Sequence, residues 1–236
     1  MNIIDVLIIL GIVLFGVSGM KRGGIRQIVG TVGFIIVLIL AFSLKNPLAE
    51  FLSLHLPFFK FGGVYHGVTA LNILFYQLIA FFIVLALLEA ILKLVLTMTG
   101  ILEKLLRMTV ILALPSKILG LVAGLIEGFL VIFIVLLVLH QPMFNIKLFE
   151  GSKLTNKILK STPLMSGFAD GIVTTVNDIY EVGKGYTDQD DSETLNREAI
   201  EIMLKHKIIT ADYVSKLVDA GKIDVLGINN IINQYR

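Results

Sequence analysis

Met20-Lys21-Arg22-Gly23-Gly24-Ile25-Arg26 is the stretch that decides how this chain folds. It places three cations between two apolar runs of 18 residues each, Ile3–Met20 and Gln27–Leu44. A helix of that length, rising about 1.5 Å per residue, can cross a bilayer core of about 30 Å. The connection is too short for anything but a tight hairpin. Because Lys and Arg beside membrane spans stay in the cytoplasm, we expect a cytoplasmic turn and an extracytoplasmic N-terminus.

The composition supports a membrane protein. Of the 236 residues, 56% are hydrophobic and 16% are charged, and the mean hydropathy is +0.88. Soluble domains usually have about a quarter of their residues charged. Residues 1–140 carry nine cations and five anions, whereas residues 141–236 carry eleven cations and thirteen anions. This pattern predicts an integral membrane bundle followed by a mildly acidic tail. It excludes nucleic-acid binding, which needs a concentrated basic face.

We predict an all-α, polytopic membrane protein whose bundle covers residues 1–140. Its four transmembrane helices are expected at residues 3–20, 27–44, 70–88 and 118–139. Asp5 lies where a signal peptide would have a basic region, so we expect the first segment to remain as a span. Lys45-Asn46-Pro47 is expected to end the second helix, because proline disfavours the helical conformation in the residue before it. We expect the apolar loop that follows, as far as Thr69, to lie at the interface or fold back on the bundle.

The remaining segments are expected to lie outside the bilayer core. The connection 100–117 mixes charges with apolar residues at helical spacing and predicts an interfacial amphipathic helix. Residues 141–169 form an extracytoplasmic spacer, although its four lysines weakly oppose that orientation, and residues 170–236 form a small helical tail. Such a short tail makes a marginal core, so we expect it to dock on another surface or self-associate. The expected helix caps in the tail are Asp170, Ser192 and Thr210, and Gly221 is expected to close a helix.

The strongest packing signal is the glycine repeat of the fourth span. Gly120, Gly124 and Gly128 recur at every fourth residue, which places them on one helix face. Small residues let helix backbones approach closely in lipid. The repeat therefore predicts a face pressed against another helix, either in the same protomer or in a partner.

Glu127 adjoins that face, about ten residues into the span. An unpaired carboxylate there costs several kcal/mol, so we expect Glu127 to be neutral or matched with a donor such as Lys93, Asn72 or Gln77. The candidate intramembrane polar site is therefore Glu127 with Asn72 and Lys93. A hydrogen-bonded packing role for Glu127 is the alternative. Lys93 is also spaced to pair with Glu89, four residues earlier.

No catalytic, cofactor or metal site is expected from the sequence. The absence of cysteine excludes disulfides, thiolate zinc sites and cysteine nucleophiles. The four histidines are scattered, and neither a phosphate-binding loop nor a hydrolase motif occurs. Lys21-Arg22-Gly23-Gly24 offers cations and glycines to a lipid phosphate, but topology alone explains these residues.

Two motifs in order resemble one family. The first consists of Asp5 near the start of the first span, Arg22-Gly23 closing it and Arg26 three residues later. The second is the stretch Lys117-Ile118-Leu119-Gly120-x-x-x-Gly124-x-x-x-Gly128. Together with four predicted spans, they resemble the colicin V production protein (CvpA) family of bacterial inner-membrane proteins over residues 2–139. The sequence departs from the family pattern at three places, listed here: Gln27 where Glu is frequent, Ser116-Lys117 where Asp-Arg is common, and Glu127 where a basic residue is frequent.

The resemblance implies a multi-pass protein of the bacterial plasma (inner) membrane with a role in colicin V production, export and envelope maintenance. We expect both termini outside the cytoplasm. The first hypothesis is a membrane scaffold or export accessory whose tail recruits a partner, and the alternative is a small oligomeric channel or transporter that uses Glu127. Membrane lipid and either a second copy or another envelope protein are the expected partners. We also predict that the turns at Gly23 and Lys117 are neighbours, with the first or second span against the Gly120–Gly128 face.

Overall fold

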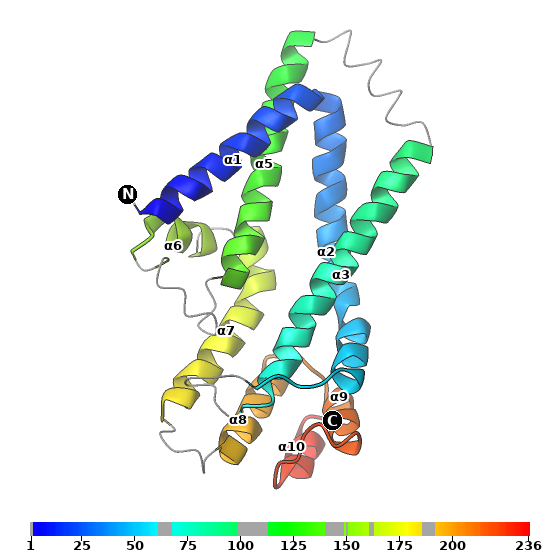
Figure 1. Ribbon diagram of the computed structural model, residues 1–236, viewed down its shortest axis with the longest axis vertical. Coiled ribbons are helices and arrows are strands. Elements are labelled where there is room, and N and C mark those ends of the chain that lie inside the picture. The colour runs from blue at the N-terminus through cyan, green and yellow to red at the C-terminus, as the bar shows by residue number, and fades with distance from the viewer. Residues whose placement is uncertain are drawn as a thin grey trace. The chain divides into compact units, whose positions relative to one another are not determined.

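The computed structural model describes residues 2–60, 68–98, 113–139, 149, 151–160, 163–185 and 192–236. Within these ranges the chain forms α-helices and no strand, which confirms the all-α prediction (Figure 1). Four helices are long and apolar enough to cross a membrane: α1 (Ile3–Arg22), α2 (Gly24–His55), α3 (Leu71–Met98) and α5 (Ala113–Leu139). The predicted amphipathic helix before Lys117 falls, as far as residue 112, outside the described residues.

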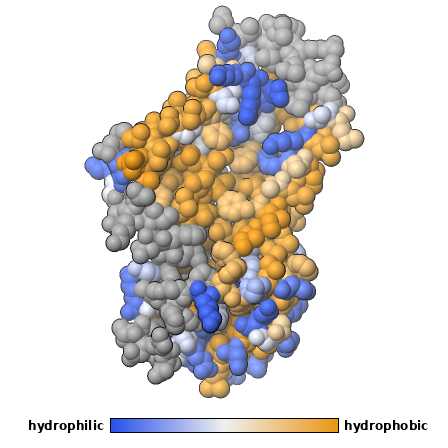
Figure 2. Space-filling view, in the orientation of Figure 1, coloured by the Kyte–Doolittle hydropathy of each residue, from blue (hydrophilic) through white to orange (hydrophobic). Residues whose placement is uncertain are grey.

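Large apolar side chains are exposed along all four long helices. Leu7 of α1 is 55% exposed, Leu87 of α3 is 58% exposed and Ile118 of α5 is 65% exposed. Figure 2 shows this apolar surface over α1. Contiguous apolar surface of this extent is rare on soluble monomers and is typical of helices that face lipid. The four helices are therefore those of an integral membrane protein.

The chain divides into two compact units that interleave along the sequence. The first unit holds residues 1–43, 82–140 and 146–162, and the second holds residues 44–81, 141–145 and 163–236. The tail thus shares its unit with the end of α2 and the start of α3, a pairing that the sequence analysis did not anticipate.

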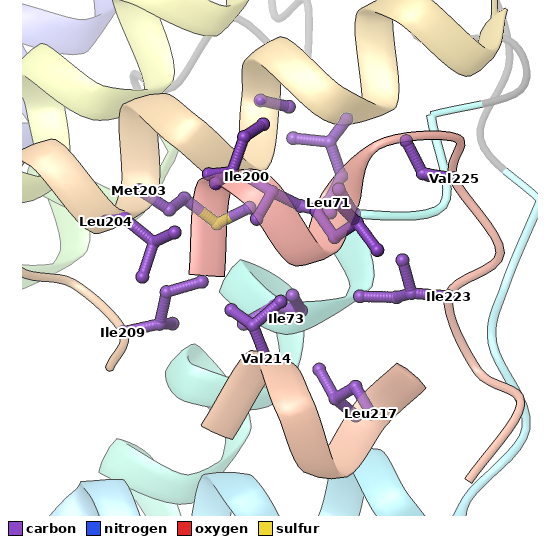
Figure 3. Close-up of a cluster of buried hydrophobic side chains, with 14 of the residues drawn as sticks. Leu71, Ile73, Ile200, Met203, Leu204, Ile209, Val214, Leu217, Ile223 and Val225 are labelled. Atoms are coloured by element: carbon purple, nitrogen blue, oxygen red, sulfur yellow. The ribbon is translucent and has the colours of Figure 1, made fainter. Parts of the chain in front are cut away.

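The core of the second unit joins the tail to the start of α3. Leu71 and Ile73 of α3 are fully buried beside Ile200 and Met203 of α8 (Ser192–Lys205) and Leu217 of α9 (Ala211–Asp219) (Figure 3). The tail therefore docks on its own chain, which agrees with the expectation that it needs another surface. A helix start that the hydropathy pattern assigns to lipid is here buried in protein.

Helix α2 does not end at Pro47, so that prediction is wrong. Proline removes one backbone donor from the helix ladder. The helix nevertheless runs to His55, because the turns after Pro47 are held by the tail. Ala49 and Ser53 are fully buried, and the Tyr213 hydroxyl lies within hydrogen-bonding distance of both the Ala49 carbonyl oxygen and the Ser53 hydroxyl. Burial raises the pKa of Tyr213 to about 12, so its hydroxyl stays protonated at neutral pH.

The exposed apolar part of α3 differs from the predicted third span. Residues 71–80 include seven that are buried, whereas the exposed large apolar side chains of α3 lie between Phe82 and Met98. This distribution favours a membrane crossing closer to the C-terminal end of α3 than the predicted 70–88. At about 42 Å for 28 residues, α3 is longer than the bilayer core requires.

The shorter helices follow the capping signals in part. Helix α7 (Pro163–Gly185) begins at a proline and already contains Asp170, so the predicted cap at Asp170 is wrong. Proline suits a first helical position because the N–H it lacks would have no partner in the helix there. The cap at Thr210 is confirmed, since its side chain accepts a hydrogen bond from the Tyr213 N–H at 3.2 Å. The last helix of the tail is α10 (Ile228–Gln234).

Two turns after tail helices use left-handed backbone. Lys207 after α8 has φ 56°, and Gly221 after α9 has φ 66°. Their neighbours Ile208 and Lys222 each donate a backbone hydrogen bond five residues back, at 2.9 Å. Gly221 thus ends α9 as predicted, and this hydrogen-bonding pattern is typical of helix C-termini.

Asn196 holds the start of α3 against the tail. Its Oδ1 accepts hydrogen bonds from the Ala70 N–H at 2.9 Å and from the Thr69 hydroxyl at 3.0 Å, and the side chain is buried. An amide oxygen on α8 therefore satisfies a buried donor just before α3 begins.

We predict that Asn196→Ala lowers the free energy of unfolding by about 1–3 kcal/mol, because the buried Ala70 N–H loses its acceptor. Thermal unfolding followed by circular dichroism at 222 nm, together with protease resistance of the tail, measures the effect. Asn229→Ala, on the exposed side of α10, is the matched control and should be nearly neutral. Equal loss in both variants would contradict this role for Asn196.

Candidate functional site

Helices α1 and α5 meet along a seam of glycines within the first unit (Figure 1). A Cβ atom added to Gly19 would overlap the Gly120 carbonyl oxygen, and one added to Gly124 would lie 2.5 Å from the Phe15 carbonyl oxygen. At Gly128 the added atom would lie 2.5 Å from the Phe15 Cβ. The prediction that the glycine face of α5 packs on the first or second span is confirmed, and the partner is α1.

The turn between α1 and α2 depends on the backbone of Gly23. Gly23 has φ 85° and ψ 149°, a conformation almost restricted to glycine, and its N–H donates to the Gly19 carbonyl oxygen at 3.2 Å. Next to it, the Gly24 N–H donates to the Ser116 hydroxyl oxygen at 2.8 Å. The turn of Arg22-Gly23 therefore lies against the start of α5, as predicted. An aspartate in place of Ser116 could accept the same bond, so this departure from the family pattern keeps an acceptor.

Four cations gather around this contact. Lys21 and Arg22 end α1, Arg26 lies in the first turn of α2, and Lys117 follows Ser116. All four side chains are exposed. We call these residues, with the Gly24–Ser116 contact, the basic junction.

Asp5 lies at the opposite end of α1 and caps two helices. One carboxylate oxygen accepts from the Asn2 N–H at 3.2 Å, completing a capping box for α1. The other accepts from the Ser152 hydroxyl at 2.7 Å and the Leu154 N–H at 3.2 Å, at the start of α6 (Lys153–Lys160). Asp5 is only 4% exposed. It thereby fixes the segment after α5 beside the beginning of α1.

Glu127 has partners other than those that the sequence suggested. The Gln27 side-chain amide donates to its carboxylate at 2.5 Å, and the Thr31 hydroxyl lies 3.3 Å from the same oxygen. Gln27 and Thr31 are buried on α2, while Glu127 is half-buried. Thr31 also donates to the Ala123 carbonyl oxygen at 3.2 Å. The carboxylate is thus held by neutral donors between α2 and α5.

The other members of the predicted polar site bind elsewhere. Asn72 donates to the carbonyl oxygens of Phe59 and Thr69, at 3.0 Å each. Lys93 pairs with Glu89 at 3.6 Å, as its spacing predicts, and is largely exposed. Gln77 accepts a hydrogen bond from Lys45. The grouping of Glu127 with Asn72 and Lys93 is therefore not formed by these contacts.

Polar residues within apolar stretches were the signal that the sequence analysis underused. Gln27 and Thr31 are four residues apart and so share a helix face, but Gln27 was noted only as a departure from the family pattern. Ser152 and Thr155 have the spacing of a helix cap, and the Ser152 hydroxyl oxygen accepts from the Thr155 N–H at 3.2 Å. Their pairing with Asp5, 147 residues away, has no local sequence signature.

Family comparison agrees with this geometry. The profile described as colicin V production protein matches residues 4–163. The chain belongs to this family. The match ends where α7 begins, so it includes Asp5, the basic junction, the α1–α5 seam and α6, and it leaves out the helices α7 to α10. Comparisons with curated proteins and with solved structures each found no match.

Membership of the colicin V production family gives the motif residues a shared setting. Arg22-Gly23, Arg26 and Lys117 form the basic junction, and Gly120, Gly124 and Gly128 form the seam that continues from it. Asp5 closes the far end of α1. The motif residues therefore build and terminate one helix pair. In the part of the chain that the structure describes, no three His, Asp or Glu side chains lie close enough to hold a metal ion.

We predict that Gly124→Ala lowers the free energy of unfolding by about 1–3 kcal/mol or prevents accumulation of the protein, because the added methyl group meets the α1 backbone. Unfolding in detergent, followed by circular dichroism, measures the change. Gly30→Ala is the matched control, since no heavy atom lies within 4 Å of its added Cβ. That variant should be neutral or more stable by up to about 1 kcal/mol, because alanine favours helix. If Gly124→Ala is as stable as Gly30→Ala, the seam is not a close backbone contact.

Proposed function

We propose that this chain is a non-enzymatic membrane scaffold or accessory for colicin V-type toxin production and export and for envelope maintenance. The observation that carries the proposal is the close packing of the family-motif glycines between α1 and α5. These residues fill the contact between two helices and leave no room along it for a solute. Such a seam suits a protein that presents a rigid membrane platform to other proteins.

The tail supports the recruiting part of this proposal. Its apolar residues are used in the core of the second unit, and its outer surface carries exposed charged residues of both signs. A folded, polar surface of this kind suits reversible contact with another envelope protein or a second copy of the chain. The family match does not extend over α7 to α10, so we infer that this surface selects a partner particular to this chain.

A small oligomeric channel or transporter is the second candidate. The observation in its favour is a half-buried carboxylate, that of Glu127, bound by the neutral donors Gln27 and Thr31 in a membrane-spanning region. Ionisable residues at such depth often mark ion or proton pathways. In the scaffold proposal, Glu127 instead joins α2 to α5 by hydrogen bonds.

The Glu127→Gln variant separates the two proposals, because glutamine keeps hydrogen-bonding capacity and removes the titratable group. We expect full-length wild type and Glu127→Gln to give the same ion flux in proteoliposomes as empty liposomes. We also expect both to restore toxin export and detergent resistance in cells that lack the chain. Glu89→Gln, which alters another carboxylate on a long apolar helix, is the control. A Glu127-dependent ion leak would contradict the scaffold proposal and support the channel.

We further propose that the protein lies in the bacterial plasma (inner) membrane with both termini outside the cytoplasm. The basic junction and the Asp5–Ser152 contact lie at opposite ends of α1, so they belong to opposite membrane faces. Four exposed cations favour the cytoplasmic face for the junction. Lys153 and Lys157 of α6 then lie outside, and their smaller number is outweighed. Among the described helices none after α5 qualifies as a span, which favours an extracytoplasmic tail.

The lack of native cysteine makes this orientation directly testable. We expect a membrane-impermeant maleimide to label Lys157→Cys in intact spheroplasts, because Lys157 is exposed on α6. Lys21→Cys, exposed at the other end of α1, should react only after lysis. The reverse pattern would show that the protein has the opposite orientation.

A further inference from the structure

The basic junction brings together cations that are distant in sequence. The Gly24 N–H and the Ser116 hydroxyl oxygen, 2.8 Å apart, join the α1–α2 turn to the start of α5. Lys21, Arg22 and Arg26 lie within three residues of Gly24, and Lys117 adjoins Ser116. The backbone contact is buried and specific, and four exposed positive charges surround it.

No carboxylate of the described residues offsets this charge. None of the four cations takes part in an ion pair within the described ranges, and the first turns of α2 and α5 contain no acidic residue. The next carboxylate along α5 is that of Glu127, about three helical turns further on, where Gln27 binds it. The junction is therefore a concentrated positive patch that suits an anionic ligand.

Apolar side chains begin directly beside these charges. Met20 is 36% exposed, Ile28 is 38% exposed and Ile118 is 65% exposed, and they continue into the apolar surfaces of α1, α2 and α5. Cations followed at once by lipid-facing residues place the junction at the level of the headgroups. An anion with an acyl chain could contact the charges and the apolar surface together, whereas a free anion could contact only the charges.

We propose that the basic junction binds the headgroup phosphate of an anionic phospholipid, with the acyl chains lying on the exposed apolar faces of the adjoining helices. Arg22 and Arg26 present planar guanidinium groups that can bind phosphate oxygens in pairs. Lys21 and Lys117 contribute point charges. The structure adds Lys117 and the lipid-facing rim to the cations of the turn, which is why more than topology is involved.

The test measures binding of phosphatidylglycerol to the full-length protein in a neutral detergent, with bound lipid resolved by native mass spectrometry. Each Lys or Arg near an anionic surface contributes about a fivefold change in affinity, so loss of two predicts binding about 30-fold weaker. We expect this loss in Arg22→Gln/Arg26→Gln and a similar loss in Lys21→Gln/Lys117→Gln. The second pair keeps the test valid if the arginine pair does not fold, which circular dichroism will show.

The control is Arg197→Gln/Lys205→Gln, which removes two exposed cations from α8 in the tail and should bind phosphatidylglycerol as wild type does. Phosphatidylcholine should bind at least tenfold more weakly than phosphatidylglycerol, and inorganic phosphate should not compete at equal concentration. The proposal is overturned if the folded junction variants bind as wild type does, if the tail control loses as much affinity, or if phosphatidylcholine binds equally. Equal binding by inorganic phosphate would replace the phospholipid with a free anion and would also overturn it.

Discussion

The first unit depends on the contact between the backbones of α1 and α5. In a bilayer, apolar side chains gain little by leaving lipid for protein, so close van der Waals packing must hold the helices together. Gly19 and Gly124 provide that packing because neither has a Cβ atom to separate the two backbones. The same closeness brings Gly24 within hydrogen-bonding distance of Ser116 and so determines where the cations of the turn lie.

The two ends of α1 show how one helix organises a membrane unit. At one end, Gly23 turns the chain and Ser116 accepts the Gly24 N–H. At the other, Asp5 caps both α1 and α6, which fastens the segment after α5. Each end satisfies backbone donors that would otherwise lie unpaired near the apolar region, where an unsatisfied N–H is costly. The residues of the family signature are concentrated at these ends and along the seam between them.

The polar groups inside the apolar helices follow the same physical rule. Glu127 is bound by Gln27 and Thr31, and Lys45 is bound to Gln77 and Asn46. Each polar side chain has a specific partner on its own or a neighbouring helix. Hydrogen bonding reduces the cost of placing these groups away from water. A structural role of this kind is compatible with a scaffold, and the same arrangement at Glu127 is what makes a channel the competing proposal.

The sequence by itself determined the local properties: the four apolar helices, the glycine face of α5, the cap at Thr210 and the cations that flank the spans. These depend on composition and on helical spacing within a few turns. It could not show that α2 passes Pro47, because the support comes from Tyr213, 166 residues later in the chain than Pro47. Nor could it assign the start of α3 to a protein core, since leucine and isoleucine are equally suited to lipid and to protein. Only the tertiary structure decided the partners of Asp5, Glu127 and Gly120, because contacts between distant segments follow from packing and leave no periodic pattern in the sequence.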